Sequence, residues 1–140
     1  MFLYIAANTI YYNETEKKEA ARVVCDKIYG QSKIISGCDL YYEVQMPDTF
    51  SFDHPTGSFI GRATIGDNFN FTQGCTVDHY NAVYPVIGKN VTMKNGSTVL
   101  GKSHIGDNCF ISAGAMIVDE DIPTGSIVSG KSPNLVITAR

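Results

Sequence analysis

The chain has 140 residues and a net charge of −3 at neutral pH, with a pI near 5.5. This acidic balance argues against a nucleic-acid-binding surface, which is usually basic. No apolar run approaches the roughly 20 residues of a membrane-spanning helix, and the first residues lack the basic lead of a signal peptide, so we expect a cytoplasmic protein. The cysteines show no Cys-x-x-Cys spacing, which predicts four reduced, buried thiols: Cys25, Cys38, Cys75 and Cys109.

The N-terminal stretch predicts a short helix. Asn13 is a candidate N-cap with Glu16 three residues on, a capping-box arrangement, and Gly30 is a candidate stop. An apolar stripe with helical spacing lies between them: Ala20, Ala21, Val24, Cys25 and Ile28. We expect this helical region, residues 1–33, to cap the repeat domain that follows, with a contact between copies of the chain as the alternative.

Apolar residues recur every six positions from residue 34 to residue 117. The series is Ile34, Leu40, Met46, Phe52, then Phe59, Ile65, Phe71, Val77, then Ile87, Met93, Val99, Ile105, Ile111 and Ile117. A period of six is neither a helix nor a strand alternation, but it is typical of a parallel β-helix, where three hexads close one triangular coil of about 18 residues. The sequence therefore predicts an all-β fold, a β-helix over residues 34–122 with a closing segment over 123–140.

Three similar turns mark one side of the predicted coils. The motif IG[DK]N begins at Ile65, Ile87 and Ile105, at spacings of 22 and 18 residues, and Gly74, Gly96 and Gly114 keep the same spacings. Glycine suits corners that need positive φ or close backbone approach.

The six-residue period is interrupted twice, and each interruption contains a histidine. One extra residue falls at Asp53–Gly57 and four fall at Asp78–Pro85, which include His54 and His79. Loops on a rigid scaffold often carry function, and histidine exchanges protons near neutral pH. A surface histidine in a turn is the alternative for both, and His104, in a regular repeat, is expected to be an outward corner residue.

The hexads resemble the left-handed β-helix of the hexapeptide-repeat acyltransferases, and the left hand is expected from that resemblance. Asp39, followed fourteen residues later by the sequence Asp-His-Pro-Thr-Gly, resembles the serine acetyltransferase branch. The resemblance implies that His54 is a general base, which deprotonates a hydroxyl for direct attack on the thioester of acetyl-CoA. It also implies that Asp39 orients the imidazole.

The same resemblance implies how the donor binds. Acetyl-CoA would lie in a groove between the prisms of a homotrimer, lined by backbone at Asn95 and Ala113. The family places a basic residue in its closing stretch, but Leu135 stands at that position here, so Lys131 is expected to substitute for it.

The acceptor is expected to differ from that of the named branch. The corresponding loop of that branch ends in Arg-His-Pro, whereas Val83 and Tyr84 precede Pro85 here. A buried carboxylate without a cation is costly, and the helical domain that the branch carries upstream is missing from this sequence. We therefore predict O-acetylation of a saccharide bound by Asp53, His79 and Tyr84. Serine is the alternative, with Arg62 or a second copy clamping its carboxylate.

Two other functions remain as alternatives. A γ-type carbonic anhydrase needs three histidines on zinc, but the three histidines of this chain map to different coil positions, and no metal is expected. A structural, ice-binding β-helix needs a flat array of threonines, and the series formed by Thr64, Thr76, Thr92 and Thr98 is interrupted.

Overall fold

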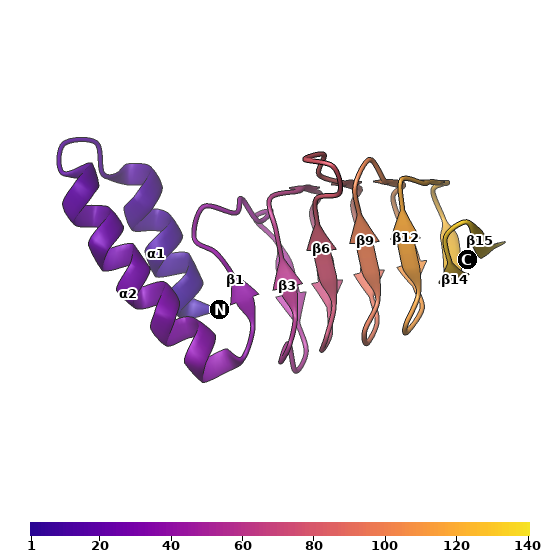
Figure 1. The fold of residues 1–140 in the computed structure, drawn as a ribbon, viewed down its shortest axis with the longest axis horizontal. Coiled ribbons are helices and arrows are strands. Elements are labelled where there is room, and N and C mark those ends of the chain that lie inside the picture. The colour runs from indigo at the N-terminus through magenta and orange to yellow at the C-terminus, as the bar shows by residue number, and fades with distance from the viewer.

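The computed structural model describes residues 1–140 as two helices followed by a left-handed parallel β-helix of about five turns (Figure 1). The first face of the triangular prism contains β1 (Asp39–Leu40), β3 (Phe59–Ile60), β6 (Thr76–Asp78), β9 (Thr98–Leu100) and β12 (Met116–Val118). The second contains β2 (Phe50–Phe52), β5 (Phe69–Phe71), β8 (Thr92–Met93), β11 (Phe110–Ile111) and β14 (Ser126–Lys131). The third contains β4 (Thr64–Ile65), β7 (Val86–Ile87), β10 (His104–Ile105) and β13 (Asp121–Ile122). The expected fold class is confirmed.

The core of the prism is the stack of hexad residues. In register down the first face, Ile60 pairs with Val77, Val77 with Val99, and Val99 with Ile117. The hexad residues predicted from Ile65 onward are all buried: Ile65, Phe71, Val77, Ile87, Met93, Val99, Ile105, Ile111 and Ile117. Each coil therefore shields the apolar side chains of its two neighbours, which is why the stack is stable only as a whole.

The beginning of the hexad series was assigned wrongly. Ile34 belongs to a helix and is 78% exposed, and Phe59 points outward, whereas its neighbour Ile60 is 1% exposed. Two adjacent apolar residues can place either one inside, and a shift by one residue exchanges the two faces of a strand.

Three residues of the recurring IG[DK]N turn have distinct structural roles. The isoleucine enters the core, and the glycine allows close approach, because a Cβ on Gly66 would lie 2.7 Å from the carbonyl carbon of Gly88. The asparagines adopt positive φ, between 56° and 58°, at Asn68, Asn90 and Asn108. Their side chains form a ladder, in which each amide donates a 2.9 Å hydrogen bond to the next side-chain oxygen.

Two helices, rather than one, cover the first coil (Figure 1). They are α1 (Phe2–Asn13) and α2 (Lys18–Ser36), so Asn13 ends a helix instead of capping one, and Gly30 lies inside α2. The end of α2 is Gly37, at φ 65°, whose amide donates to the carbonyl of Lys33. The hairpin caps the prism through a small core of Ala7, Cys25 and Tyr42.

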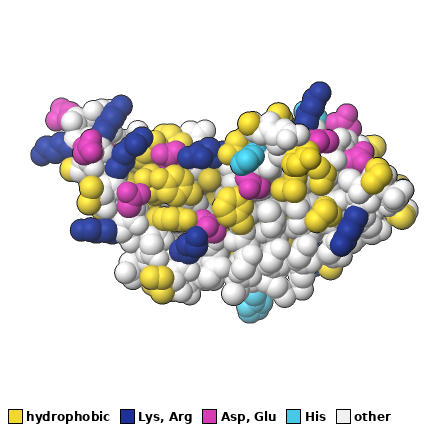
Figure 2. Space-filling model, viewed as in Figure 1, with side chains coloured by type: hydrophobic (Ala, Val, Ile, Leu, Met, Phe, Trp, Pro, Cys, Tyr) yellow, Lys and Arg dark blue, Asp and Glu magenta, His cyan; other side chains and the backbone are white.

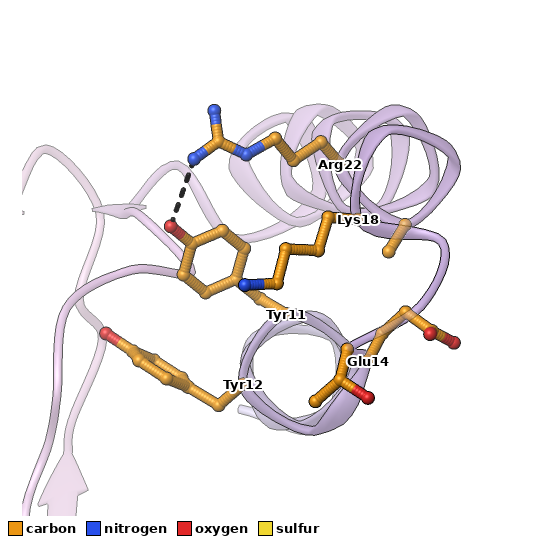
Figure 3. A pocket seen from close by; sticks show the side chains of 7 residues that line it. Tyr11, Tyr12, Glu14, Lys18 and Arg22 are labelled. Atoms are coloured by element: carbon orange, nitrogen blue, oxygen red, sulfur yellow. Dashed lines mark hydrogen bonds between the residues drawn. The ribbon is translucent and has the colours of Figure 1, made fainter.

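The turn between the helices forms a pocket of about 240 Å³ (Figure 3). Arg22 lies over the ring of Tyr11 and donates a 3.3 Å hydrogen bond to its hydroxyl, and Lys18 and Glu14 border the opening. No residue that the sequence links to function lines this pocket.

At the other end, β15 (Asn134–Ala139) turns back and pairs antiparallel with β14. The four cysteines are free and buried, as predicted. Neither helix is long and apolar enough to cross a membrane.

Candidate active site

His54 lies at an exposed corner between β2 and β3. Its backbone has φ 49°, its carbonyl accepts a 2.8 Å hydrogen bond from the Thr56 amide, and Gly57 follows at φ 76°. A positive φ is uncommon outside glycine and is often found at functional sites. The imidazole is 86% exposed, and its Nε2 atom lies 3.4 Å from Oδ1 of Asp53. The ring is therefore open to a substrate, with one carboxylate beside it.

Asp39 begins β1, and helix α2 holds its carboxylate. The Tyr29 hydroxyl donates a 2.5 Å hydrogen bond to Oδ1, and the Lys33 ammonium donates one of 2.5 Å to Oδ2. Burial and then the bond to Asp39 raise the pKa of Tyr29, and the same carboxylate raises the pKa of Lys33. No hydrogen bond joins Asp39 to His54 within the chain, so the structure does not bring the expected pair together.

The loop Asp78–Pro85 is a small β-hairpin. Tyr80 and Val83 exchange two backbone hydrogen bonds of 3.0 and 3.1 Å, and the two residues between them have φ of 50° and 62°, as in a type I′ turn. At its base the rings of His79 and Tyr84 meet edge to face, with centroids 5.3 Å apart. Two of the residues predicted to bind the acceptor substrate are thus in contact.

The two histidine loops lie at opposite ends of one face. The corner with His54 precedes β3, the loop with His79 follows β6, and β3 and β6 are parallel neighbours. Strands rise about 3.3 Å per residue, so the loops are separated by roughly 10 Å or more. Figure 2, which views this face, shows histidine side chains at both its upper and its lower edge. A single copy cannot combine both loops in one site.

A pocket of about 390 Å³ lies on the same face, where it meets the helices. We call it the tyrosine pocket, because Tyr29, Tyr41 and Tyr84 line it together with Phe59. Its charged lining residues are Asp39, Arg62 and Asp78. Figure 2 shows hydrophobic side chains gathered between the helical end and the strands, with acidic and basic groups around them.

The corner that holds His54 continues along the prism as a column of exposed backbone. The Gly74 amide donates to the carbonyl of Thr56, that of Gly96 to Gln73, and that of Gly114 to Asn95, at 2.9–3.0 Å. The predicted residues Asn95 and Ala113 are therefore one coil apart at this corner, and both are exposed. Neither of their own amides donates a hydrogen bond within the chain.

Lys131 lies at the far end of this column. It is exposed, and its backbone is in register with Met116, which follows the last corner. His104 faces outward on the third face and contacts Asp121 at 2.9 Å, as expected for a residue outside the site. No group of three or more histidine, cysteine or acidic side chains is placed to hold a metal ion.

A family model for the bacterial transferase hexapeptide, described as six repeats, matches residues 84–119. The match falls on the coils that follow the hairpin loop. The match and the fold fit the hexapeptide-repeat acyltransferase superfamily.

Individual proteins are similar over longer stretches of the chain. A putative serine acetyltransferase of Schizosaccharomyces pombe is 33% identical over 92 residues, which is 62% of this chain and 34% of that protein. The Neisseria gonorrhoeae serine acetyltransferase has a similar structure, with a TM-score of 0.82, 23% identity, and coverage of 99% of this chain and 52% of that one. The Brucella abortus serine acetyltransferase in complex with coenzyme A has a TM-score of 0.81 at 21% identity, with coverage of 99% and 54%. This hexapeptide-repeat chain spans about a third of the curated relative and about half of each structure.

The sequence did not predict that several residues lining the tyrosine pocket belong to a site. Tyr29 belongs to helix α2, Tyr41 is not one of the predicted inward positions of the repeat, and the hexad spacing predicts Phe59 in the core. Arg62 was considered only as a carboxylate clamp, and here it pairs with Glu43 at 2.6 Å. The helix and linker residues gave no signal, because only the packing of the helical hairpin brings them to this face.

Proposed function

We propose that this protein transfers an acetyl group from acetyl-CoA to the hydroxyl of serine or a closely similar hydroxy amino acid. The sequence alone favours a saccharide acceptor, but the relative and the structural neighbours are named serine acetyltransferases, which supports the alternative. A neighbour with coenzyme A bound supports the donor.

The observation that carries the proposal is the column of unpaired amides that leads away from His54. Gln73, Asn95 and Ala113 present backbone N–H groups that donate to nothing within the chain. The pantetheine arm of coenzyme A is a chain of amide groups, and it suits such a line of donors. Lys131, at the far end, provides a cation for the nucleotide phosphates.

His54 is the proposed general base. Its imidazole takes the proton of the acceptor hydroxyl while the oxygen attacks the thioester carbonyl. The tetrahedral intermediate then releases the coenzyme A thiolate, which takes a proton from the imidazolium, so no acyl-enzyme forms. Asp53 is the nearest carboxylate within the chain, and Asp39 is the carboxylate that the resemblance implies.

The proposed site is shared between copies of the chain. An acceptor held by the loop Asp78–Pro85 can reach a His54 only if a second copy presents that corner, because the two loops of one copy lie at opposite ends of the face. A homotrimer supplies three such junctions, and Phe59 and Met116 expose 37% and 38% of their surface on this face. Light scattering at micromolar concentration is expected to give the mass of a trimer, and a monomer would contradict the shared site.

The decisive assay follows thiol release from acetyl-CoA with a panel of L-serine, sugars and nucleotide sugars. We expect serine-dependent release with a kcat/KM of about 10⁴ M⁻¹s⁻¹ or more, as in ordinary enzymes. Turnover of a sugar without turnover of serine would restore the saccharide acceptor. If none of the compounds in the panel supports thiol release, both proposed acceptors are contradicted.

A further inference from the structure

The tyrosine pocket opens on the first face, and none of its lining residues belongs to the donor column. Its residues come from three parts of the chain: α2, the linker after β1, and the first coils. Gly61 forms part of the lining, and a Cβ at this position would lie 3.1 Å from Oδ1 of Asp78 and 3.2 Å from the ring of Phe59. The missing side chain therefore keeps the space beside the Asp78 carboxylate open.

The charges of the pocket are not balanced. Asp39 is paired with Lys33 at 2.5 Å, and Arg62 is paired with Glu43 at 2.6 Å. Asp78 has no cationic partner, since its only side-chain hydrogen bond comes from the His79 amide, at 2.7 Å to Oδ1. One oxygen of this half-buried carboxylate thus remains without a partner in the chain.

The walls around Asp78 are aromatic. Tyr29, Tyr41 and Tyr84 line the pocket, and the rings of Tyr29 and Tyr41 meet edge to face with centroids 5.0 Å apart. Aromatic faces attract cations, and carboxylates form strong, charge-assisted hydrogen bonds with ammonium groups. Lys33 and Arg62 already lie over the rings of Tyr29 and Tyr41, at 5.9 and 5.8 Å from the ring centroids. The Asp78 carboxylate is the charge of the pocket that is left without a partner.

We propose that the tyrosine pocket binds the ammonium group of the acceptor and that Asp78 is its counter-ion. This inference rests on the proposed function and deepens it, because it assigns the residue that recognises the amine of the hydroxy amino acid. The hydroxyl of the bound acceptor would have to meet the His54 of a second copy, because the His54 of the same copy lies at the opposite end of the face.

The binding test uses the full chain without acetyl-CoA. Ethanolamine carries the ammonium and the hydroxyl, and ethylene glycol is its neutral counterpart of similar size. We expect ethanolamine to shift tyrosine NMR signals of the wild type, while ethylene glycol does not. Asp78→Asn keeps a side-chain oxygen that can accept the hydrogen bond of the His79 amide. This variant is expected to weaken ethanolamine binding by at least ~10-fold, because a charge-assisted contact is lost.

Two further variants separate a local effect from a general one. Asp48→Asn removes the same charge from an exposed carboxylate outside the pocket and is expected to change ethanolamine binding by less than about 2-fold. Tyr84→Leu removes one aromatic wall without altering Asp78 and is expected to weaken binding by several-fold. Unchanged ethanolamine binding in Asp78→Asn would overturn the inference.

The kinetic test distinguishes failure of this inference from failure of the proposed function. With L-serine, Asp78→Asn is expected to raise KM at least ~10-fold and to change kcat much less, as for a residue that binds the acceptor without joining the chemistry. Equal KM values for L-serine in the two proteins, or equal turnover of 3-hydroxypropanoate and L-serine, would reject the ammonium pocket while acetyl transfer stands. Binding of ethanolamine that depends on Asp78, without acetyl transfer to any acceptor, would reject the proposed function and retain the pocket.

Discussion

The side-chain amide of Asn68 donates a 2.9 Å hydrogen bond to the side-chain oxygen of Asn90, one coil further along the prism. Asn90 extends the ladder to Asn108 and has φ 56°. Asn90→Ala is expected to lower the free energy of unfolding by about 2 kcal/mol, because alanine is strained in this conformation and two hydrogen bonds are lost.

Asn90→Gly separates these two causes. Glycine tolerates positive φ, so only the hydrogen bonds are lost and the cost is expected to be about half of that for alanine. Urea denaturation of the three proteins measures the difference. If glycine and alanine are equally destabilising, the backbone conformation of Asn90 contributes nothing.

His54→Ala is expected to lower kcat/KM for acetyl transfer by at least ~10²-fold, the usual contribution of a general base. The side chain is 86% exposed and its ion-pair contact is with the exposed carboxylate of Asp53, so the thermal midpoint should change little. His104→Ala is the matched control, since His104 contacts only Asp121 on another face. Near-full activity of His54→Ala, measured beside this control, would assign the base elsewhere.

Asp39→Asn is expected to reduce activity less than His54→Ala, because Asp39 can act only by positioning another group. Asp53→Asn is the comparison, since Asp53 is the carboxylate beside the imidazole. Removal of the carboxylate that orients the imidazole is expected to lower kcat with little change in KM, because the general base is then less often aligned with the acceptor hydroxyl. The variant that lowers kcat identifies the partner of His54, and an unchanged kcat in both variants would show that neither carboxylate has that role.

The stability of the protein is expected to fall in alkaline solution through Cys38. Burial, followed by the charge of Asp39, raises the pKa of this thiol to about 11 from its ordinary 9.0. The pKa of Cys38 is higher in the folded state than in the unfolded state. Its contribution to the free energy of unfolding is therefore complete below pH 9 and is lost as the pH rises through 11. At about 1.36 kcal/mol per pH unit, the loss approaches roughly 2–3 kcal/mol.

Urea denaturation at pH 8 and pH 10.5 measures this loss. Cys38→Ala is expected to reduce the pH dependence without abolishing it, because burial also raises the pKa of Tyr4 and Tyr29. The comparison uses the difference between the two pH values, so the cost of the shortened side chain cancels. An unchanged pH dependence in the variant would show that Cys38 does not titrate in this range.

The repeat made much of this fold predictable. Its hexads identify the core, since each inward residue must meet the same type of residue one coil above and below. The helical cap was less predictable, because Asn13 and Gly30 are suited to helix ends by type, while the ends are set by the packing of α1 against α2. Phe59 and Ile60 could not be distinguished, as either can fill the core.

The candidate site was predictable only where it follows the repeat. Asn95 and Ala113 lie where the 18-residue coil puts them, and His54 is exposed at an interruption. The bonds of Asp39 to Tyr29 and Lys33 depend on a helix that carries no repeat, and the distance between the two histidine loops depends on which end of a strand each one occupies. Spacing along the sequence contains neither kind of information.

The column of corner amides has a length that is set by the number of coils. Three steps lead from Thr56 through Gln73 and Asn95 to Ala113, and at about 4.8 Å per coil they span about 14 Å. Deleting one whole coil would leave every strand with partners of the same kind, yet it would bring Lys131 about 4.8 Å closer to His54. A donor held in an extended conformation along the column would then no longer match both ends at once. On the proposed function, the number of coils between these two residues is matched to the length of coenzyme A.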